Sequence, residues 1–351
     1  MRILVTGGAG FIGCNLVSYL LGETVSEFGI QIDRVVTLDK LTYAGSRANL
    51  AAVEKDSRHV FVQGDIGDPL LVGSLLREHR IDSVVHLAAE SHVDHSIANP
   101  ENFVMTNIVG TYRLLEAFRC YLMELATAEG RFLHVSTDEV FGSLKAEAVA
   151  FCETTPYAPN SPYSASKAGS DHIARAYHET YGLPVITTNC SNNYGPYQFP
   201  EKLIPLALRK ILRNEPIPVY GNGTHVRDWL YVDDHCRGMV AALVCGTPGR
   251  TYVIGGECEM RNIDLVHAII ETVRELAPEK VTKPIEQMIA FVNDRPGHDF
   301  RYAINPMRIK SELGWTARES FPSGIRKTVQ WYLDHQDWIA GSLSPLREVS
   351  T

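Results

Sequence analysis

The strongest constraint on the fold is the alternation of short apolar runs with helical segments in the first half of the chain. The apolar runs predict buried strands at Arg2–Val5, Val35–Asp39, Val60–Gly64, Ser83–Leu87, Phe132–Ser136 and Pro184–Asn189. The segments between them predict helices at Phe11–Leu21, Asn102–Leu125 and Ala165–Tyr181. Because parallel strands are joined by helical crossovers, this order indicates an α/β fold with a Rossmann-type, doubly wound parallel sheet.

The alternation of predicted strands and helices ends after about residue 190, where prolines divide the chain into loops and short elements. Three further helices are predicted, near Pro205–Arg213, Asn262–Glu275 and Ser323–His335. We expect a smaller α/β substrate-binding lobe over 191–335 that closes over a sheet domain formed by 1–190. The lobe is either separate from that domain or interleaved with it, and 336–351 is expected to be a C-terminal tail.

The overall charge argues against some classes of partner. With 41 acidic and 33 basic residues the net charge is -8, so binding to nucleic acid or to a membrane surface is not expected. No apolar run approaches the roughly 20 residues that span a bilayer, and we expect neither an anchor nor a leader segment. Any bound phosphate must therefore be met by local groups.

Cysteines and histidines limit the chemistry further. The seven cysteines are scattered and form no C-x-x-C pair, which favours a reducing, cytoplasmic location over a disulfide framework. His86, His92 and His95 lie close together in the sequence, and Asp233-Asp234-His235 forms a second group. Neither group has a spacing typical of a metal site, so no bound metal is expected.

A glycine-rich loop, Gly7-Gly8-Ala9-Gly10-Phe11-Ile12-Gly13, joins the first predicted strand to the first predicted helix. Glycines at 7, 10 and 13 permit a tight turn, close approach of a pyrophosphate and close contact between helix and strand. The helix N-terminus then offers free N–H groups to the phosphates. Asp39 ends the second strand, where it can accept a hydrogen bond from a ribose 2′-hydroxyl and would repel a 2′-phosphate. NAD is therefore expected rather than NADP, although Lys40 weakens this preference.

The segment Tyr163-Ser164-Ala165-Ser166-Lys167 places a tyrosine and a lysine on one face of a predicted helix. A tyrosine with an ordinary pKa of about 10 is a poor base at neutral pH. A nearby ammonium and the positive charge of a nicotinamide both favour the phenolate. Such a phenolate can take the proton of a sugar hydroxyl while hydride leaves the same carbon, which predicts dehydrogenase chemistry.

Two adjacent carboxylates, Asp138 and Glu139, follow the fifth predicted strand. The carboxyl ends of strands in such a sheet face the cofactor. Loss of water across C5 and C6 of a sugar requires a base for the C5 proton and an acid for the C6 hydroxyl, whereas chemistry confined to C4 does not. The pair therefore favours a dehydration.

The glycine loop, Leu87-Ala88-Ala89 and Tyr163–Lys167 together resemble the extended short-chain dehydrogenase/reductase family over about residues 1–335. Longer matches at Leu87–Asp94, Thr137–Val140, Asn189–Pro196 and Phe199–Pro205 resemble its dTDP-glucose 4,6-dehydratases. The resemblance implies oxidation at C4, loss of water across C5–C6 and hydride return to C6, with NAD regenerated. One departure is His95, where arginine is common, and we expect it to alter local packing or oligomer contacts.

The resemblance also implies residue roles. Tyr163 with Lys167 deprotonates the C4 hydroxyl, Thr137 polarises the C4 oxygen, Glu139 removes the C5 proton and Asp138 protonates the C6 hydroxyl. Asp65 is expected to accept from the adenine amino group. The expected cofactor-binding residues are Gly7, Gly10, Phe11, Ile12, Gly13, Asp39, Lys40, Leu41, Thr42, Asp65, Ile66, Leu87, Ala88, Ala89, Ser91, Thr106, Tyr163 and Lys167.

The substrate diphosphate requires cations, and Arg227 and Arg295 are the main candidates because a guanidinium can bond two oxygens at once. Tyr220 or a neighbour is expected to line the base pocket. The expected substrate contacts, several of them from the resemblance, are Ser91, Thr137, Asn192, Glu201, Lys202, Leu203, Pro218, Tyr220, Arg227, Asn262, Arg295 and His298.

Three alternative functions stay open at this level. The nucleoside base is not fixed, so a UDP- or CDP-hexose 4,6-dehydratase fits as well, and a nucleotide-sugar 4-epimerase shares the scaffold. A non-catalytic dinucleotide sensor is disfavoured because Tyr163, Lys167 and the paired carboxylates are all present. The resemblance further implies a homodimer in which helices near Asn102–Leu125 and Ala165–Tyr181 pair across a two-fold axis.

Overall fold

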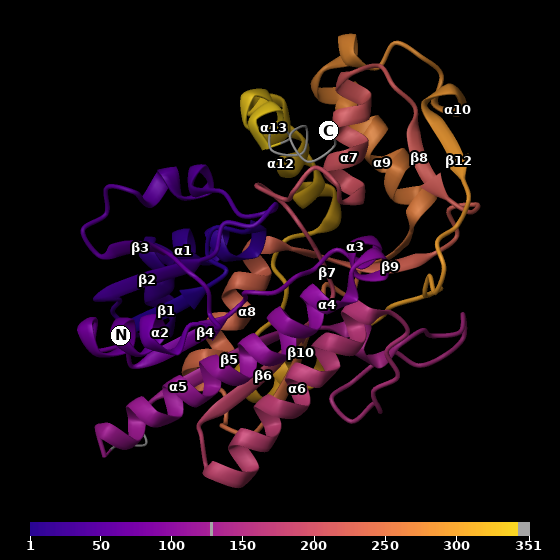
Figure 1. The fold of residues 1–351 in the computed structure, drawn as a ribbon. Helices are drawn as coiled ribbons and strands as arrows, with labels where there is room; N and C mark the ends of the chain where they lie inside the picture. Colours follow the sequence, from indigo (N-terminus) through magenta and orange to yellow (C-terminus); the bar gives the residue numbers. More distant parts are fainter. Residues whose placement is uncertain (127–128, 343–351) are drawn as a thin grey trace.

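The structure, a computed structural model, describes residues 1–126 and 129–342. Its centre is a seven-stranded parallel sheet with the order β10-β6-β5-β4-β1-β2-β3 (Figure 1). The strands are β1 (Arg2–Thr6), β2 (Arg34–Asp39), β3 (His59–Gln63), β4 (Ser83–His86), β5 (Arg131–Thr137), β6 (Val185–Cys190) and β10 (Thr251–Ile254). The six predicted strands are confirmed, and the order turns back at β1 as the doubly wound arrangement requires.

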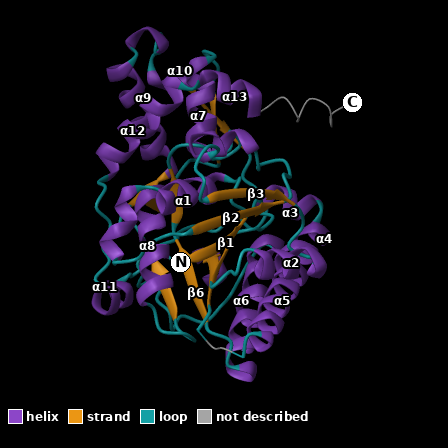
Figure 2. Ribbon diagram, turned by 90° about the vertical axis from the view of Figure 1, so that its left-hand side faces the viewer, coloured by secondary structure: helices purple, strands orange, loops and turns teal. Residues whose placement is uncertain are grey.

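Helices cover both faces of this sheet (Figure 2). On one face lie α1 (Phe11–Leu21), α8 (Val232–Cys245) and α11 (Met307–Leu313), and on the other lie α2 (Pro69–Glu78), α5 (Thr111–Glu124) and α6 (Pro162–Tyr181). Sequence reasoning missed α2, α8 and α11. In α8 nearly every residue is buried, so the polar stripe that reveals an amphipathic helix is absent. For α2 the sequence did contain an N-cap signal, namely Asp68, whose side chain accepts hydrogen bonds from the N–H groups of Leu70 and Leu71.

The helix predicted over 102–125 is one helical run with three parts: α4 (Pro100–Phe103), the π-helical segment η3 (Val104–Gly110) and α5. Single π turns inside helices occur frequently at functional sites. Here Asn107 of η3 bonds the backbone of Glu90 in both directions, accepting from its N–H at 2.9 Å and donating to its carbonyl at 3.0 Å. The irregular turn therefore anchors the loop that follows β4.

A smaller lobe lies beyond one end of the sheet (Figure 1). It has a three-stranded sheet of β7 (Asn192–Tyr194), β9 (Val226–Tyr231) and β11 (Glu259–Arg261), and a pair formed by β8 (Ile217–Tyr220) and β12 (Ile289–Val292). Helices α7 (Leu203–Leu212), α9 (Asn262–Leu276), α10 (Ile285–Met288) and α12 (Phe321–Asp334) pack around a separate core. The three helices predicted in this part of the chain correspond to α7, α9 and α12.

The lobe is not a continuous block from residue 191 to 335. β10 pairs with β6 in the large sheet, and α8 packs on that sheet, so residues 232–254 return to the first domain. The lobe is thus interleaved with the sheet domain. The expected tail starts as helix α13 (Gln336–Ser342), whose Trp338 indole N–H donates to Asn49 at 2.7 Å. The remainder of that prediction, 343–351, lies outside the described residues.

Two further features bear on the setting of the protein. Within residues 1–126 and 129–342, no helix has the length and apolar character needed to cross a bilayer. All seven cysteines are free, and Cys14, Cys190 and Cys236 are buried.

Candidate active site

One cavity runs along the carboxyl ends of the central strands, under the smaller lobe. Its walls include the glycine loop after β1, the residues that follow β2 to β5, the first turns of α6, and segments 190–193 and 198–202. All the predicted cofactor residues except Leu41 line it. Leu41 lies beside the cavity in a left-handed conformation (φ 56°), with its N–H donating to Asp39 at 2.8 Å. All five predicted catalytic residues also line the cavity.

The glycine loop has the shape that a pyrophosphate needs. A Cβ at Gly13 would lie 2.1 Å from the Gly7 carbonyl oxygen, and one at Gly7, whose φ is 70°, would lie 2.7 Å from the Ala88 nitrogen. Both glycines are therefore required for packing against the backbone. A Cβ at Gly10 would meet only the Gly7 oxygen, at 3.4 Å, so this position opens on the cavity. No side chain caps the first turn of α1, which leaves its N–H groups available to an anion.

Asp39, at the end of β2, and Asp65, which follows β3, already have partners within the protein. Asp39 accepts from the backbone N–H of Ala9 at 2.9 Å and from that of Leu41. A carboxylate has about four acceptor positions, so capacity for a ribose hydroxyl remains. Asp65 pairs with Lys40 at 2.9 Å, which neutralises the Lys40 charge that weakened the preference for NAD. The expected contact from Asp65 to an adenine amino group stays a prediction.

Tyr163 and Lys167 occupy successive turns of α6, which begins with a capping box formed by Ser161 and Ser164. Lys167 is buried, and its ammonium donates to the carbonyl of Val135 on β5 at 2.9 Å. Burial raises the pKa of Tyr163 well above its ordinary value, and the charge of Glu139 raises it further. The expected effect of Lys167 on the phenolate stays a prediction.

Asp138 and Glu139 lie together in the 3-10 turn η4 (Asp138–Phe141), which starts at the end of β5 and is capped by Thr137. Their surroundings differ in charge. Burial raises the pKa of Asp138 well above its ordinary value, and the negative charges of Glu139 and Asp228 add to this effect. Asp138 is 2% exposed, and its Oδ2 atom has no hydrogen-bond partner. It is thus the carboxyl that is most readily kept protonated.

Glu139 faces cations instead. Burial raises the pKa of Glu139, while the positive charges of Arg295, Lys202 and Arg227 oppose that rise. In a pair of neighbouring carboxyls, the member that faces more positive charge loses its proton first. The surroundings therefore favour the proton on Asp138 over Glu139, as an acid and a base for one substrate require.

Part of the predicted substrate set shares this cavity. Ser91, Asn192, Glu201 and Lys202 line it, and Lys202 donates to the Ser91 carbonyl at 3.1 Å. Glu201 accepts from the Tyr43 hydroxyl at 3.1 Å. These contacts link segment 198–202 to loops of the sheet domain.

The remaining predicted substrate residues lie outside the cavity walls. Arg227 is buried, with its guanidinium 4.3 Å from the Tyr302 ring centre and bonded to the Asp299 carbonyl at 2.9 Å. Arg295 lies 3.7 Å from Asp94, to which Tyr220 also donates. The others are Leu203 and Asn262, at the starts of α7 and α9, Pro218 in β8, and His298, whose ring stacks on that of His225. Contacts from these residues to substrate stay predictions.

Two groups of side chains have potential metal-ligand atoms within 4.8 Å of one another: His92, His95 and Glu201, and His225, Asp294 and His298. In both groups the histidines face protein cations. Lys202 and Arg295 lower the pKa of His92 beyond the effect of burial, and Arg295 and Arg227 do the same for His298. The expectation that no metal is bound stays a prediction.

His95, the departure noted in the sequence, packs between aromatic neighbours. Its ring centre lies 4.4 Å from that of His92 and 5.1 Å from that of Tyr43.

Sequence reasoning did not single out Tyr43. It also did not single out Glu90, Asn193 and Phe199, three residues that line the cavity. Phe199 and Asn193 stand inside motifs that carried the resemblance, so that signal was available. Glu90 likewise stands inside the segment Leu87–Asp94, which also carried the resemblance.

A family model described as GDP-mannose 4,6 dehydratase matches residues 4–328. A relative from Xanthomonas campestris pv. campestris (strain B100), a dTDP-glucose 4,6-dehydratase, is 57% identical over 343 residues, which is 97% of this chain and 95% of the relative. The chain belongs to this dehydratase family.

Solved structures of the family agree in fold. The dTDP-glucose 4,6-dehydratase of Streptomyces venezuelae, with NAD and TYD bound, is 45% identical, covers 97% of this chain and 100% of its own, and has a TM-score of 0.89. A UDP-glucose 4-epimerase from Thermus thermophilus, in complex with NAD, is 29% identical, covers 95% of this chain and 100% of its own, and has a TM-score of 0.80. The shared scaffold therefore hosts both reactions, and the decision between them rests on the site.

Proposed function

We propose that this chain is a hydro-lyase that converts dTDP-glucose to dTDP-4-keto-6-deoxyglucose with NAD as its cofactor. The observation that carries the proposal is the charge environment of Asp138 and Glu139 beside Tyr163 in one cavity. A dehydration across C5–C6 needs a protonated and an ionised carboxyl within reach of one sugar ring. High identity to dTDP-glucose 4,6-dehydratases over nearly the whole chain supports the same reaction.

The residues present fit a bound NAD. The glycine loop leaves no room for side chains between α1 and the strands, and the uncapped α1 N-terminus would hold the pyrophosphate. Asp39 would hold the adenosine ribose, and its charge disfavours the phosphate of NADP. When bound, NAD supplies the acceptor for a hydride from C4 and the source of a hydride for C6.

Side chains of the protein carry out the proton transfers. Tyr163 takes the proton of the C4 hydroxyl, and Lys167 supplies a positive charge one helical turn away. Oxidation at C4 makes the C5 hydrogen acidic, and Glu139 removes it. Asp138 gives its proton to the C6 hydroxyl, which leaves as water. Burial and the neighbouring negative charges raise the pKa of Asp138 well above its ordinary value, which suits it to this donation.

The substrate diphosphate is held by the positive side chains that also surround Glu139. Lys202 lines the cavity, and the charges of Arg227 and Arg295 reach the same region. A bound diphosphate would share these cations with Glu139 and thereby make that carboxylate a stronger base. Substrate binding and base activation are therefore coupled.

A nucleotide-sugar 4-epimerase is the main alternative because the scaffold supports it. The paired carboxyls favour the dehydratase, since an epimerase has no step that uses them. Incubation of the protein with dTDP-glucose tests the choice. We expect a 4-keto product that absorbs strongly in alkali, with no net consumption of NAD. Formation of dTDP-galactose without a keto product would contradict the proposal.

We further propose that the protein is a homodimer and resides in the cytoplasm. Large apolar side chains are exposed on the helical run from α4 to α5, namely Val104, Met105, Tyr112 and Met123, and Tyr181 is exposed at the end of α6. Pairing of these helices would remove that surface from water. Light scattering should give twice the chain mass, and replacement of Met105 and Tyr112 by Glu should give monomers.

The proposed cytoplasmic location rests on the free cysteines, which suit a reducing compartment. Cell fractionation can test it.

A further inference from the structure

Helix α6 carries a third ionisable residue in line with the two already described. Tyr163, Lys167 and Asp171 follow one another at intervals of four residues and so share one face of the helix. Asp171 is 4% exposed and does not line the cavity. A buried charge is costly unless it is paired, so its presence behind the reacting groups calls for an explanation.

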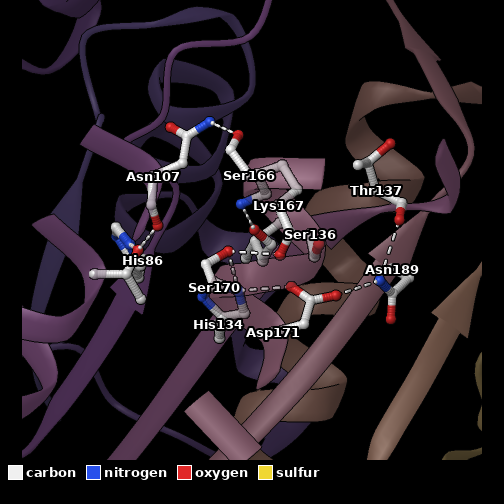
Figure 3. Close-up of polar contacts among 12 residues, drawn as sticks. His86, Asn107, His134, Ser136, Thr137, Ser166, Lys167, Ser170, Asp171 and Asn189 are labelled. Carbon is white, nitrogen blue, oxygen red and sulfur yellow. Dashed lines mark hydrogen bonds and ion pairs between the residues drawn. The ribbon is translucent and has the colours of Figure 1, made fainter. Parts of the chain in front are cut away.

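His134, Tyr157 and Asn189 surround the Asp171 carboxylate, and Figure 3 shows His134 and Asn189 beside it. His134 lies 2.9 Å from Oδ1, while the Tyr157 hydroxyl at 2.8 Å and the Asn189 amide at 3.0 Å both donate to Oδ2. Burial alone would raise the pKa of Asp171, but the hydrogen bond and electrostatic interaction with His134, followed by the charge of Lys167, outweigh it and hold that pKa below its ordinary value. Asp171 is therefore ionised within the core.

The first link from Asp171 to the site runs through Asn189. The same Asn189 amide nitrogen that bonds Asp171 also donates to the main-chain carbonyl of Thr137 at 3.1 Å (Figure 3). Thr137 is the last residue of β5 and stands directly before Asp138. The orientation of the turn that presents both carboxyls thus depends on how Asn189 is held.

The second link is electrostatic and acts on Lys167. Four titratable groups face its ammonium: Asp171 on α6, His86 on β4, His134 on β5 and Cys190 on β6. Burial lowers the pKa of both histidines, so they are neutral, and burial raises the pKa of the Cys190 thiol to about 12. Among these groups only Asp171 carries a charge at neutral pH.

We propose that Asp171 is a positioning residue of the dehydration, which fixes the backbone at Thr137 through Asn189 and balances the buried ammonium of Lys167. The inference rests on the proposed function, because it concerns the same Tyr163–Lys167 pair. It explains why a carboxylate with three donors is kept one turn below a buried lysine. It also predicts two separable effects, one on geometry and one on charge.

The charge effect is tested with Asp171→Asn in the full-length protein. We measure single-turnover formation of reduced cofactor from dTDP-glucose across pH. An anion near an ammonium raises the pKa of that ammonium, so its removal should move the alkaline limb of the pH profile to lower pH by about one unit. The kcat should fall by about ten-fold or more, with KM within about two-fold of wild type.

Tyr157→Phe is the matched control, because it removes a donor to the same carboxylate and leaves the charge in place. It should leave kcat within about two-fold of wild type and the pH profile unmoved. If Asp171→Asn and Tyr157→Phe lower kcat equally and neither moves the profile, Asp171 is merely structural and the inference is wrong. If Asp171→Asn does not fold, Asp171→Glu takes its place. Asp171→Glu keeps the negative charge, so the alkaline limb of its pH profile should stay in place. A shift of that limb would overturn the inference.

The geometric effect is tested with Asn189→Ser, which breaks the link to Thr137 and keeps the Asp171 charge. It should lower kcat by about ten-fold without moving the pH profile. An unchanged kcat would refute the link. The wild-type protein is assayed first for the 4-keto product, because its failure to form that product would refute the proposed function, whereas failure confined to the variants' profiles would refute only the role of Asp171.

Discussion

Replacement of Asp138 by Asn isolates the acid of the proposed dehydration. The two side chains are nearly the same in size, and Asp138 is buried with its Oδ2 atom unpartnered, so the fold should tolerate the change. Asparagine cannot give a proton to the C6 hydroxyl. Oxidation at C4 depends on Tyr163 and should persist. The substitution therefore stops the reaction between oxidation and loss of water.

The magnitude follows from the surroundings of the pair. General acid catalysis contributes about 10²–10⁴-fold, which corresponds to about 3–5 kcal/mol in the barrier. The raised pKa of Asp138 favours its neutral, protonated form, so its replacement by a neutral amide should change the charge around Glu139 little. Removal of the C5 proton should therefore slow by less than about ten-fold. Loss of water should slow far more than C5 exchange does.

The assay follows three signals after mixing with dTDP-glucose: reduced cofactor by absorbance, exchange of the C5 hydrogen with deuterium from solvent, and the alkaline absorbance of the 4-keto-6-deoxy product. The variant should accumulate reduced cofactor and exchange C5 hydrogen while forming little product. In the wild type, product formation should be lost as pH rises through the raised pKa of Asp138, because the donor is then ionised. Full product formation by the variant, or loss of exchange with intact oxidation, would show that the roles of the two carboxyls are assigned wrongly.

The remaining predictions concern the base, the phenol and the cofactor loop. Glu139→Gln should spare C4 oxidation but reduce C5 exchange by at least about 10²-fold, and unchanged exchange would remove Glu139 as the base. Tyr163→Phe should retain bound NAD while oxidation falls by about 10²-fold or more; turnover at the wild-type rate would contradict its role. Gly13→Ala places a Cβ 2.1 Å from the Gly7 oxygen and should lower the free energy of unfolding by about 1–3 kcal/mol in a denaturant titration. Gly10→Ala meets only one atom, at 3.4 Å, and should instead weaken NAD retention with little change in stability, so equal stability losses in both variants would refute this reading of the loop.

The residues that the sequence identified are those whose roles are encoded locally. The glycine loop, the Tyr163–Lys167 spacing and the Asp138–Glu139 pair each occupy one short segment, and a helix or a strand end places such residues together by its own geometry. The same reasoning found the six strands, because buried parallel strands are continuous apolar runs. It failed at α8, where burial on nearly all sides removes the periodic pattern.

By itself, the sequence determined the doubly wound parallel sheet, the cofactor loop and the chemistry that the paired carboxyls permit. The resemblance already implied that Asp138 is the acid, but only the tertiary structure supplies a physical reason for that choice. That choice depends on Asp228 from β9 near Asp138 and on Lys202, Arg227 and Arg295 near Glu139, all more than 60 positions distant in the chain. The return of residues 232–254 to the large sheet and the burial of Asp171 beneath Lys167 were decided in the same way. The physical reason is that pKa and burial depend on charges and atoms nearby in space, and local sequence patterns carry no information about those neighbours.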